Sequence, residues 1–361
     1  MQLLLISFLI SFLLTLLLVR FQSVHSKYSF DSLKGPQKVN PKPVSRIGGL
    51  AILCSITVTL IFRNYFTSSI SPLEDISLNF VFCLLPAFIV GFLEDITKKA
   101  GILVRLLGII FSSFLSYYYL SAEISRIGII EAEILFMIPL LGLSLSLFAM
   151  TGLTNAYNLI DGFNGLASMV GILTLISISY VSFKNADPLI IHLSLIMIGA
   201  IAGFFIWNYP NGLIFLGDGG AYLIGLYIAI LSIFLVQRHP NISPFYALVV
   251  NAYPIFETLF TIWRRRVHRG RKSMIPDGIH FHTLIYRRVM KWATRDERIA
   301  NLNNAKTSPY LWALSSITIL PATLWWNNQT YLIISAVLFC SFYVICYWWI
   351  IKFKSIRKYK K

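Results

Sequence analysis

The sequence predicts an all-α, polytopic membrane protein, built as one transmembrane helix bundle of about 11 spans. Of its 361 residues, 57% are hydrophobic and only 13% are charged, with a mean hydropathy of +0.71. Soluble domains carry about 25% charged residues. Apolar runs of spanning length also recur along the whole chain, and a span needs about 20 mostly apolar residues. We therefore expect residues 1–361 to form a single integral membrane domain.

The first apolar run, Met1–Val19, has no basic residue before it and Arg20 directly after it. This polarity favours a first span with its N-terminus outside over a cleaved signal peptide. The further expected spans are Ile47–Phe62, Leu78–Leu93, Leu103–Leu120, Ile134–Leu153, Leu166–Phe183, Leu189–Trp207, Ala221–Val236, Pro244–Trp263, Tyr310–Trp326 and Tyr331–Ile351. The expected cytoplasmic segments are the loops 20–46, 94–102, 154–165, 208–220 and 264–308 and the basic tail 352–361.

The positive charges test this topology. Of the 31 lysines and arginines, 27 fall in or beside the segments expected inside, and only Arg63, Arg126, Lys184 and Arg238 fall outside. This asymmetry follows the positive-inside rule. It also accounts for most of the net charge of +16, so the charge requires no nucleic-acid partner.

A short polar motif, Asn155-Ala-Tyr-Asn158-Leu-Ile-Asp161-Gly162-Phe-Asn164-Gly165, separates the fifth and sixth apolar runs. Its glycines permit tight turns and a close approach of the backbone to a ligand. A helix is expected to begin directly after it, and the free N–H groups and dipole of a helix N-terminus suit an anion such as phosphate. The alternative is an ordinary polar turn between two membrane helices.

Several carboxylates fall on the same expected face, each beside a glycine. Glu94 and Asp95 end the third run, Asp161 follows the fifth and Asp218 follows the seventh. Carboxylates at membrane depth are costly and are usually functional or paired. Hard carboxylate oxygens hold Mg²⁺ through one or two protein ligands while substrate phosphates and water complete its coordination.

The structural alternative for the acidic pair is an ion pair with Lys98 or Arg105. Asp187 falls in an outer loop, where we expect a solvated charge, and Glu257 lies inside the ninth run.

The large loop begins with the basic run 264–272 and continues to His280 and His282. Beside a membrane, such a run attracts anionic lipid heads or holds phosphates. The two histidines fit either ordinary loop positions or donors to a pyrophosphate.

Five separate pieces in this order resemble one family, the polyprenyl-phosphate N-acetylhexosamine-1-phosphate transferases, which start the synthesis of cell-envelope glycans, peptidoglycan and N-glycans. The resemblance runs from Pro43 to about Arg288. The pieces are the Lys/Pro stretch ending in Gly48-Gly49, Gly91-Phe-Leu-Glu94-Asp95-Ile-Thr-Lys98, the polar motif above, Asn208 with Phe215-Leu-Gly217-Asp218-Gly219-Gly220, and His280-Phe-His282.

The resemblance implies that a lipid phosphate oxygen attacks the β-phosphorus of a UDP-N-acetylamino sugar, so that UMP leaves and a polyprenyl-diphospho-sugar stays in the membrane. It further implies a Mg²⁺ cofactor, with Mn²⁺ as an alternative. The implied roles are Asp218 for the metal; Glu94, Asp95 and Asp161 for catalysis; Asn158, Asn208, Phe215 and Lys98 for the nucleotide; and His280, His282, Arg269 and Arg271 for phosphate or sugar.

Three positions depart from the usual pattern of the family. Glu94 replaces the first residue of an Asp-Asp pair, Asn164 replaces a second aspartate, and the histidine run is reduced to His280 and His282. Asn164 lacks the charge of the usual aspartate, which puts a ligand role for that position in doubt. The reduced histidine run, together with 11 expected spans rather than ten, favours the branch that initiates O-antigen, common-antigen or similar glycans over the muramyl-pentapeptide branch of peptidoglycan synthesis, which is kept as an alternative.

A membrane transporter with a carboxylate site on the cytoplasmic face is the competing class, since such residues also mark transport pathways. The expected location is the cytoplasmic (inner) membrane, with the active site on the cytoplasmic face. The expected partners are the UDP-sugar, the lipid phosphate and the bilayer, and a homodimer is left open.

Overall fold

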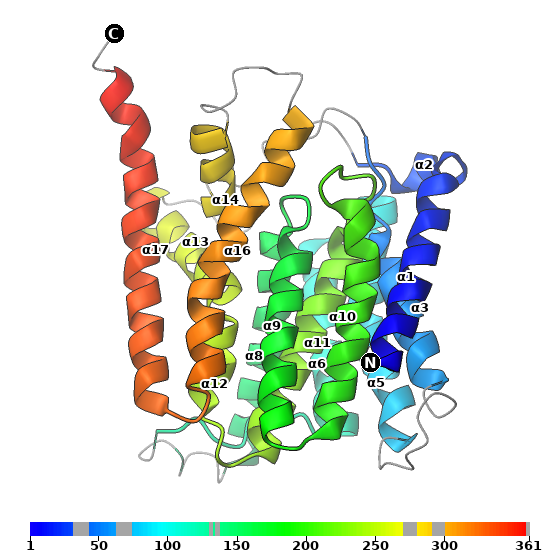
Figure 1. Cartoon of the computed structure of the whole chain (residues 1–361), viewed down its shortest axis with the longest axis vertical. Helices are drawn as coiled ribbons and strands as arrows, with labels where there is room; N and C mark the ends of the chain where they lie inside the picture. Colours follow the sequence, from blue (N-terminus) through cyan, green and yellow to red (C-terminus); the bar gives the residue numbers. More distant parts are fainter. Residues whose placement is uncertain are drawn as a thin grey trace.

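The computed structural model describes residues 1–31, 43–62, 74–129, 133, 138–269, 280–290 and 300–358. Within these ranges the chain is helical, and its one β-type contact is an isolated bridge between Phe30 and Ser45. The expected all-α membrane bundle is confirmed, and Figure 1 shows its long helices running side by side along one axis.

Each of the predicted spans coincides with a helix or with a bent helix pair. In chain order the elements are α1 (Gln2–Arg20), α2 (Gln22–Ser29), α3 (Gly48–Ile61), α5 (Glu74–Thr97), α6 (Ile102–Leu120), α8 (Pro139–Ile160), α9 (Leu166–Lys184), α10 (Pro188–Asn208), α11 (Gly217–Arg238), α12 (Pro244–Val250), α13 (Ala252–Arg269), α14 (Phe281–Leu284), the π-helix η2 (Ile285–Met290), α16 (Ala300–Leu324) and α17 (Gln329–Lys358).

Among the described residues, eight helices are long and apolar enough to cross a membrane. A ninth crossing is added if α12 and α13, which meet at a bend of 73°, form one broken span. Helix α3 is apolar but shorter, with 14 residues. The number of crossings and their orientation therefore stay predictions.

Segments far apart in the sequence gather at one end of the bundle, which we call the site end. It carries α2, the turn between α8 and α9, the start of α11 and α14 (Figure 1). The end of α17, which leads into the basic tail, lies at the same end. The described parts of the segments expected to be cytoplasmic thus share one end of the molecule.

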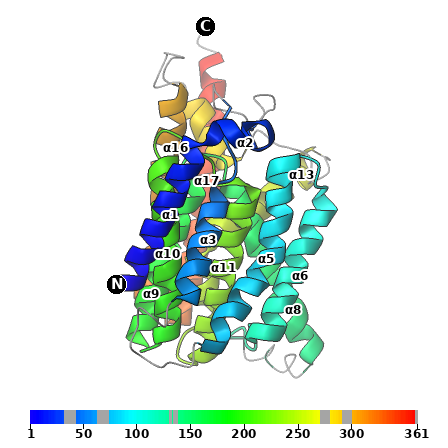
Figure 2. The same ribbon diagram turned by 90° about the vertical axis from the view of Figure 1, so that its right-hand side faces the viewer.

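Helix α11 is the centre of the bundle, and the whole of its apolar window is buried. A helix that is hydrophobic all round fits such a position. It packs against α3, α5, α8 and α9, and Figure 2 shows it between α3 and α5.

Glycines allow α3 and α5 to contact α11 backbone to backbone at the site end. A Cβ atom on Gly49 would lie 2.4 Å from the Cα of Gly220, and one on Gly91 would lie 2.5 Å from the amide nitrogen of Gly219. No real Cβ sits so close, so these glycines are required by the packing. They set the distance between the end of α5 and the start of α11, where Asp95 and Asp218 lie.

Helix α1 packs on α10 through small residues. Gly199 and Gly203 of α10 face the backbone of α1, because a Cβ on either would lie within 2.5 Å of a carbonyl oxygen of α1. Ser7 and Ser11 donate hydrogen bonds to the carbonyl oxygens of Ile196 and Ala200, at 2.7 and 2.6 Å. Small residues at such spacing let membrane helices approach closely and bond across the contact.

At the opposite end, Asp187 corrects the sequence-based expectation of a solvated loop charge. Its side chain is buried and accepts hydrogen bonds from Arg238 Nε (2.6 Å) and His239 Nε2 (2.9 Å). Burial acts to raise the pKa of Asp187, but these bonds outweigh it, so the pKa lies below its ordinary value. The carboxylate therefore joins the start of α10 to the end of α11.

Three boundaries also differ from the prediction. The polar motif expected as a loop remains helical through Ile160, because Thr154 and Tyr157 pack against Gly225 of α11. The loop expected from Arg264 to Ser308 contains the end of α13, all of α14 and η2, and the start of α16. The ninth predicted span is broken at Asn251.

Candidate active site

Asp95 and Asp218 form the centre of a charged cluster at the site end. Asp218 is the second residue of α11, and Asp95 lies in the last turn of α5. The carboxylate of Asp95 accepts hydrogen bonds from the amide nitrogens of Asp218 and Gly219, both at 2.9 Å. Free N–H groups at a helix N-terminus favour a negatively charged acceptor. Asp95 thus caps α11 from a neighbouring helix and fixes Asp218.

Two arginines hold the carboxylate of Asp218. Arg46 Nη2 lies 2.7 Å from Oδ1 and Arg105 Nη1 lies 2.6 Å from Oδ2. Arg46 also reaches Asp95, with Nε at 3.3 Å from Oδ1. Burial lowers the pKa of Arg46, but the carboxylates of Asp218, Asp95 and Asp31 outweigh it and raise the pKa above its ordinary value. Arg105, which the structural alternative paired with Glu94 or Asp95, is paired with Asp218.

Two further carboxylates belong to this cluster. Burial raises the pKa of Asp161 to about 7; Arg46 lowers it and Asp218 raises it further, which places Asp161 in the field of the same groups. Glu94 is half-buried, and its Oε2 atom is buried with no hydrogen-bond partner among the described residues. An unpaired buried acceptor costs about 1–3 kcal/mol. Such an oxygen has free capacity for a cation or a donor from a substrate.

Asparagines hold the turn from Asp161 to Gly165. Asn208 accepts a hydrogen bond from the Gly165 amide at 2.6 Å and donates one to the Ile214 carbonyl at 2.7 Å. Asn164 donates to the carbonyl oxygen of Pro210 at 3.1 Å, which an aspartate could not do. Both side chains are buried. Their bonds shape the loops of the site, and they explain the amide at position 164.

The segment before α11 is tied to the segment before α3. The amide nitrogen of Phe215 donates to the Ser45 carbonyl (2.8 Å), and the Phe215 carbonyl accepts from the Gly48 amide (2.9 Å). Phe215 is half-buried, as is Asn158 on the last turn of α8. Lys98 is exposed, and its ammonium group donates to the carbonyl oxygen of Phe30. These contacts link α2, α3 and α5 around the charged cluster.

His280 and His282 are buried against the Asp161–Gly165 turn. Their rings stack with centroids 5.2 Å apart, and the His282 ring meets the edge of Phe163 at 5.5 Å. A Cβ on Gly162 would lie 3.0 Å from His282 Nε2, so the absence of a side chain there makes room for the ring. Burial lowers the pKa of His282 to about 3, which keeps this imidazole neutral near pH 7. The side chain of Arg269 and the whole of Arg271 lie outside the described part of the chain.

The donor set fits a hard divalent cation held by few protein ligands. Within the described ranges, no three His, Cys, Asp or Glu side chains are grouped so as to bind a metal ion together. The unpaired oxygen of Glu94 and the carboxylate of Asp218 are nevertheless hard donors at the site end. Mg²⁺ is usually bound by one or two carboxylates, with phosphate and water as its other ligands. A cation bound with a phosphorylated substrate is consistent with this arrangement.

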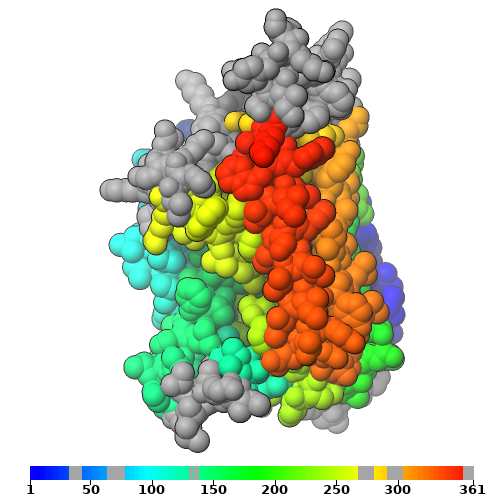
Figure 3. All heavy atoms as spheres, turned by 90° about the vertical axis from the view of Figure 1, so that its left-hand side faces the viewer, coloured from blue at the N-terminus to red at the C-terminus, as the bar shows by residue number. Residues whose placement is uncertain are grey.

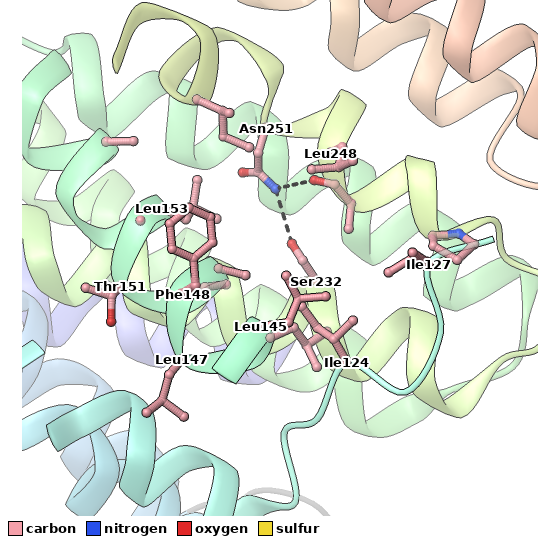
Figure 4. Close-up of a pocket in the computed structure, with 18 of the residues that line it drawn as sticks. Ile124, Ile127, Leu145, Leu147, Phe148, Thr151, Leu153, Ser232, Leu248 and Asn251 are labelled. Carbon is pink, nitrogen blue, oxygen red and sulfur yellow. Dashed lines mark hydrogen bonds between the residues drawn. The ribbon is translucent and has the colours of Figure 1, made fainter. Parts of the chain in front are cut away.

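A large apolar cavity of about 910 Å³ lies between α6, α8, α11, α12 and α13. Its lining runs from Glu123 and Pro244, at the end opposite the site, to Leu106 and Ile262, nearer the site end. Figure 4 shows Leu145, Phe148 and Leu248 among its lining side chains, and Figure 3 shows the face where α8, α13 and α17 meet the surface.

The cavity has few polar groups. One of them, Asn251 at the helix break, donates hydrogen bonds to Ser232 Oγ (3.3 Å) and to the Ala247 carbonyl (3.0 Å), as Figure 4 shows. This lining suits an elongated apolar molecule.

The structure brings together Glu94, Asp95, Asp161 and Asp218, as the sequence predicts. Sequence reasoning missed the site role of Arg46, which was assigned only to the inner charge excess, and it considered Arg105 only as a structural ion-pair partner of the Glu94-Asp95 pair. The one available signal for Arg46 was its position two residues before Gly48-Gly49 in a proline-rich stretch.

Comparison with known proteins gives a consistent result. Residues 77–236 match the family model described as glycosyl transferase family 4. The chain is 26% identical over 293 residues, covering 80% of it and 77% of the relative, to a probable undecaprenyl-phosphate N-acetylglucosaminyl 1-phosphate transferase of Bacillus subtilis. It is 25% identical over 289 residues, covering 79% and 81%, to an undecaprenyl-phosphate alpha-N-acetylglucosaminyl 1-phosphate transferase of Thermotoga maritima. A phospho-N-acetylmuramoyl-pentapeptide-transferase of Streptococcus thermophilus is 25% identical over 244 residues, covering 65% and 72%.

The fold and the cluster define a multi-pass membrane protein with a centre of carboxylates and arginines at one end of its bundle. Over residues 77–236 the chain is similar to glycosyl transferase family 4, and its whole-length relatives include two named for undecaprenyl-phosphate N-acetylglucosaminyl 1-phosphate transfer.

Proposed function

We propose that this protein transfers an N-acetylamino-sugar 1-phosphate from a UDP-sugar, UDP-GlcNAc or a related UDP-HexNAc, to undecaprenyl or a similar polyprenyl phosphate. The products are a polyprenyl-diphospho-sugar and UMP. The observation that carries the proposal is the placement of Asp218, fixed by Asp95 and flanked by Arg46 and Arg105, at the start of the buried central helix.

In the reaction, an oxygen of the lipid phosphate attacks the β-phosphorus of the UDP-sugar, and the bond from that phosphorus to the oxygen bridging it to the α-phosphorus breaks. That oxygen leaves with UMP. Asp218 and Glu94 would hold Mg²⁺ or Mn²⁺, which supplies neutralisation of phosphate charge. The guanidinium groups of Arg46 and Arg105 stabilise negative charge at the same place, since arginine matches phosphate geometry.

The remaining residues bind and orient the substrates. Asn208 holds the turn that presents Asp161, and Phe215 offers a ring near the charged cluster for stacking on uracil. Asp161 carries a raised pKa, which suits a group that exchanges a proton with the lipid phosphate, whose second pKa is about 6. Lys98 and Asn158 lie at the edge of this centre.

The apolar cavity supports a lipid acceptor. It extends along most of α8 and along the first half of α13, and its lining is mostly apolar. An elongated chain can lie there while its phosphate reaches the site end. The excess of positive charge supports a cytoplasmic site end, because the end of α17, which leads into the basic tail, lies at this end.

Two features favour a UDP-HexNAc over the muramyl-pentapeptide substrate. The histidine run is short, with His280 and His282 buried rather than presented to a large ligand. The relatives from Bacillus subtilis and Thermotoga maritima are both named for N-acetylglucosaminyl 1-phosphate transfer. We therefore place the reaction at the initiation of an O-antigen-like or common-antigen-like glycan.

A substrate panel tests the proposal. Purified protein in detergent, with undecaprenyl phosphate and Mg²⁺, is given UDP-GlcNAc, other UDP-HexNAc donors or UDP-MurNAc-pentapeptide, and the release of UMP is measured. We expect release with a UDP-HexNAc, and its loss with chelator. Release only with the pentapeptide donor would assign the muramyl branch, and no release with any donor would overturn the proposed function.

A further inference from the structure

A fully buried carboxylate outside the charged cluster holds the histidine segment in place. Glu257 lies in α13, and none of its surface is exposed. Its Oε1 atom accepts a hydrogen bond from the Phe281 amide at 3.1 Å, and its Oε2 atom accepts one from the Tyr343 hydroxyl at 2.5 Å. His280 Nδ1 lies 3.5 Å from Oε1. The carboxylate thus joins α13, α14 and α17.

Burial of a carboxylate in a membrane bundle is costly unless donors surround it. Here both oxygens are used, and two of the three neighbouring donors belong to the segment from His280 to His282. A carboxylate accepts hydrogen bonds only, so Nδ1 of His280 must carry its hydrogen when it points to Glu257. The hydroxyl of Thr261 lies 3.3 Å from the same nitrogen. These contacts fix both the backbone of the segment and the orientation of the first ring.

The His280–His282 segment packs against the Asp161–Gly165 turn of the candidate active site. His280 stacks on His282, and His282 fills the space above Gly162 and contacts Phe163. Asp161 directly precedes Gly162 and Phe163 in the chain. A continuous path of contacts therefore runs from Glu257 through the two rings to the turn that carries Asp161.

We infer that Glu257 is a positioning residue, which holds the His280–His282 segment against the Asp161–Gly165 turn and thereby sets the geometry of the active site. The effect on turnover rests on the proposed function, whereas the effect on the segment does not. Tyr343 offers a matched control, because it contacts the opposite oxygen of the same carboxylate and touches neither histidine ring through a hydrogen bond.

The first experiment measures the segment without using activity. Wild-type protein, Glu257→Gln and Tyr343→Phe are treated with diethyl pyrocarbonate, and carbethoxylation of each histidine is quantified by peptide mass spectrometry. We expect His280 and His282, which are 3% and 4% exposed, to be protected in the wild type. Labelling of both should rise at least about five-fold in Glu257→Gln, with His239 at the opposite end unchanged and with Tyr343→Phe close to wild type. Unchanged protection in Glu257→Gln, or an equal rise in Tyr343→Phe, would overturn the inference.

The second experiment is a double-mutant cycle on kcat/KM for the UDP-sugar. A misplaced site costs about 10²-fold when atoms shift by about 1 Å, so we expect Glu257→Gln to lose about 10- to 100-fold. In a His280→Ala background the same change should cost less than about three-fold, because residues that act through one path are not additive. The KM for the lipid phosphate should stay within about three-fold of wild type, since the apolar cavity does not include Glu257.

Full additivity of the two changes would reduce Glu257 to a general structural role and contradict the inference. If Glu257→Gln does not accumulate as folded protein, Glu257→Asp replaces it, because it keeps the charge and shortens the side chain by one methylene. Its histidine labelling should rise and its kcat/KM should fall, both by less than in Glu257→Gln. Wild-type labelling and kinetics in folded Glu257→Asp would refute the positioning role. A wild-type protein that turns over no UDP-sugar refutes the proposed function, while the labelling experiment still decides the role of Glu257.

Discussion

The contact between Gly91 and Gly219 allows a sharp test of how packing places the carboxylates that we propose to be catalytic. In Gly91→Ala, the new Cβ would lie 2.5 Å from the amide nitrogen of Gly219. That nitrogen donates to Asp95 Oδ2 at 2.9 Å, so α5 and α11 cannot separate without disturbing this bond. The neighbour is backbone and has no rotamer to change. Overpacking of this kind costs about 1–3 kcal/mol of folding free energy.

The movement of α5 relative to α11 in Gly91→Ala should reduce the activity more than the stability. A displacement of about 1 Å at a catalytic group can cost about 10²-fold in rate. We therefore expect Gly91→Ala to lower the thermal unfolding midpoint in detergent by a few degrees and the rate of UMP release by about 10²-fold. Both measurements are made on the same purified protein.

Gly142→Ala is the matched control. Its Cβ would also lie 2.5 Å from a neighbour, but that neighbour is the tip of the Glu123 side chain, which can rotate away. Alanine should also favour helix α8 by about 0.5–1 kcal/mol relative to glycine. We expect this variant to keep its activity and to unfold at or slightly above the wild-type midpoint. Equal losses in both variants, or none in Gly91→Ala, would refute the packing argument.

Three further predictions follow from other parts of the structure. Asn208→Ala leaves two buried partners unpaired, the Gly165 amide and the Ile214 carbonyl, and each should cost about 1–3 kcal/mol of folding free energy. The unfolding midpoint should therefore fall, and a midpoint equal to that of the wild type would contradict these hydrogen bonds. The folded pKa of Asp187 lies below its unfolded value of about 3.9, so its contribution to stability is present above that pH and is lost as the pH falls through the folded pKa. Between pH 7 and pH 3, the unfolding midpoint of the wild type should therefore drop more at the acidic end than the midpoint of Asp187→Asn. Parallel curves for the two proteins would contradict this role of Asp187. In a background without the four native cysteines, a cysteine at Thr97, an exposed position at the site end, should react with a membrane-impermeant reagent only from the cytoplasmic side, and reaction from outside would invert the proposed orientation.

The sequence predicts the helices well because apolar runs of spanning length are a strong signal. The break at Asn251 was not predicted, although Asn251 and Pro254 interrupt the otherwise mostly apolar run from Pro244 to Trp263. In the structure α12 packs on α16 and α17, whereas α13 packs on α8 and α16, and one sequence does not show these partners. The helical state of Asn155 to Ile160 was likewise hidden, because polar residues suggest a loop until the buried partner, Gly225, is known.

The candidate site is predicted in its carboxylates but not in their partners. Aspartates beside glycines at the ends of apolar runs are rare enough to stand out, so Asp95, Asp161 and Asp218 could be found. Arg46 lies 172 positions before Asp218 in the chain, and one sequence holds no signal for such a pairing. For the same reason Glu257 could be seen as unusual, but its contact with the histidine segment could not.

The central claim is that the cluster around Asp218 is the catalytic centre. The most direct test compares Asp218→Asn with Asp187→Asn, since both aspartates are buried and paired with an arginine, but at opposite ends of the bundle. With equal amounts of folded protein, undecaprenyl phosphate, Mg²⁺ and the preferred UDP-sugar, we expect Asp218→Asn to lose at least about 10²-fold in UMP release, and Asp187→Asn to stay within a few-fold of wild type. Near-normal release by Asp218→Asn, or an equal loss in both variants, would contradict the account.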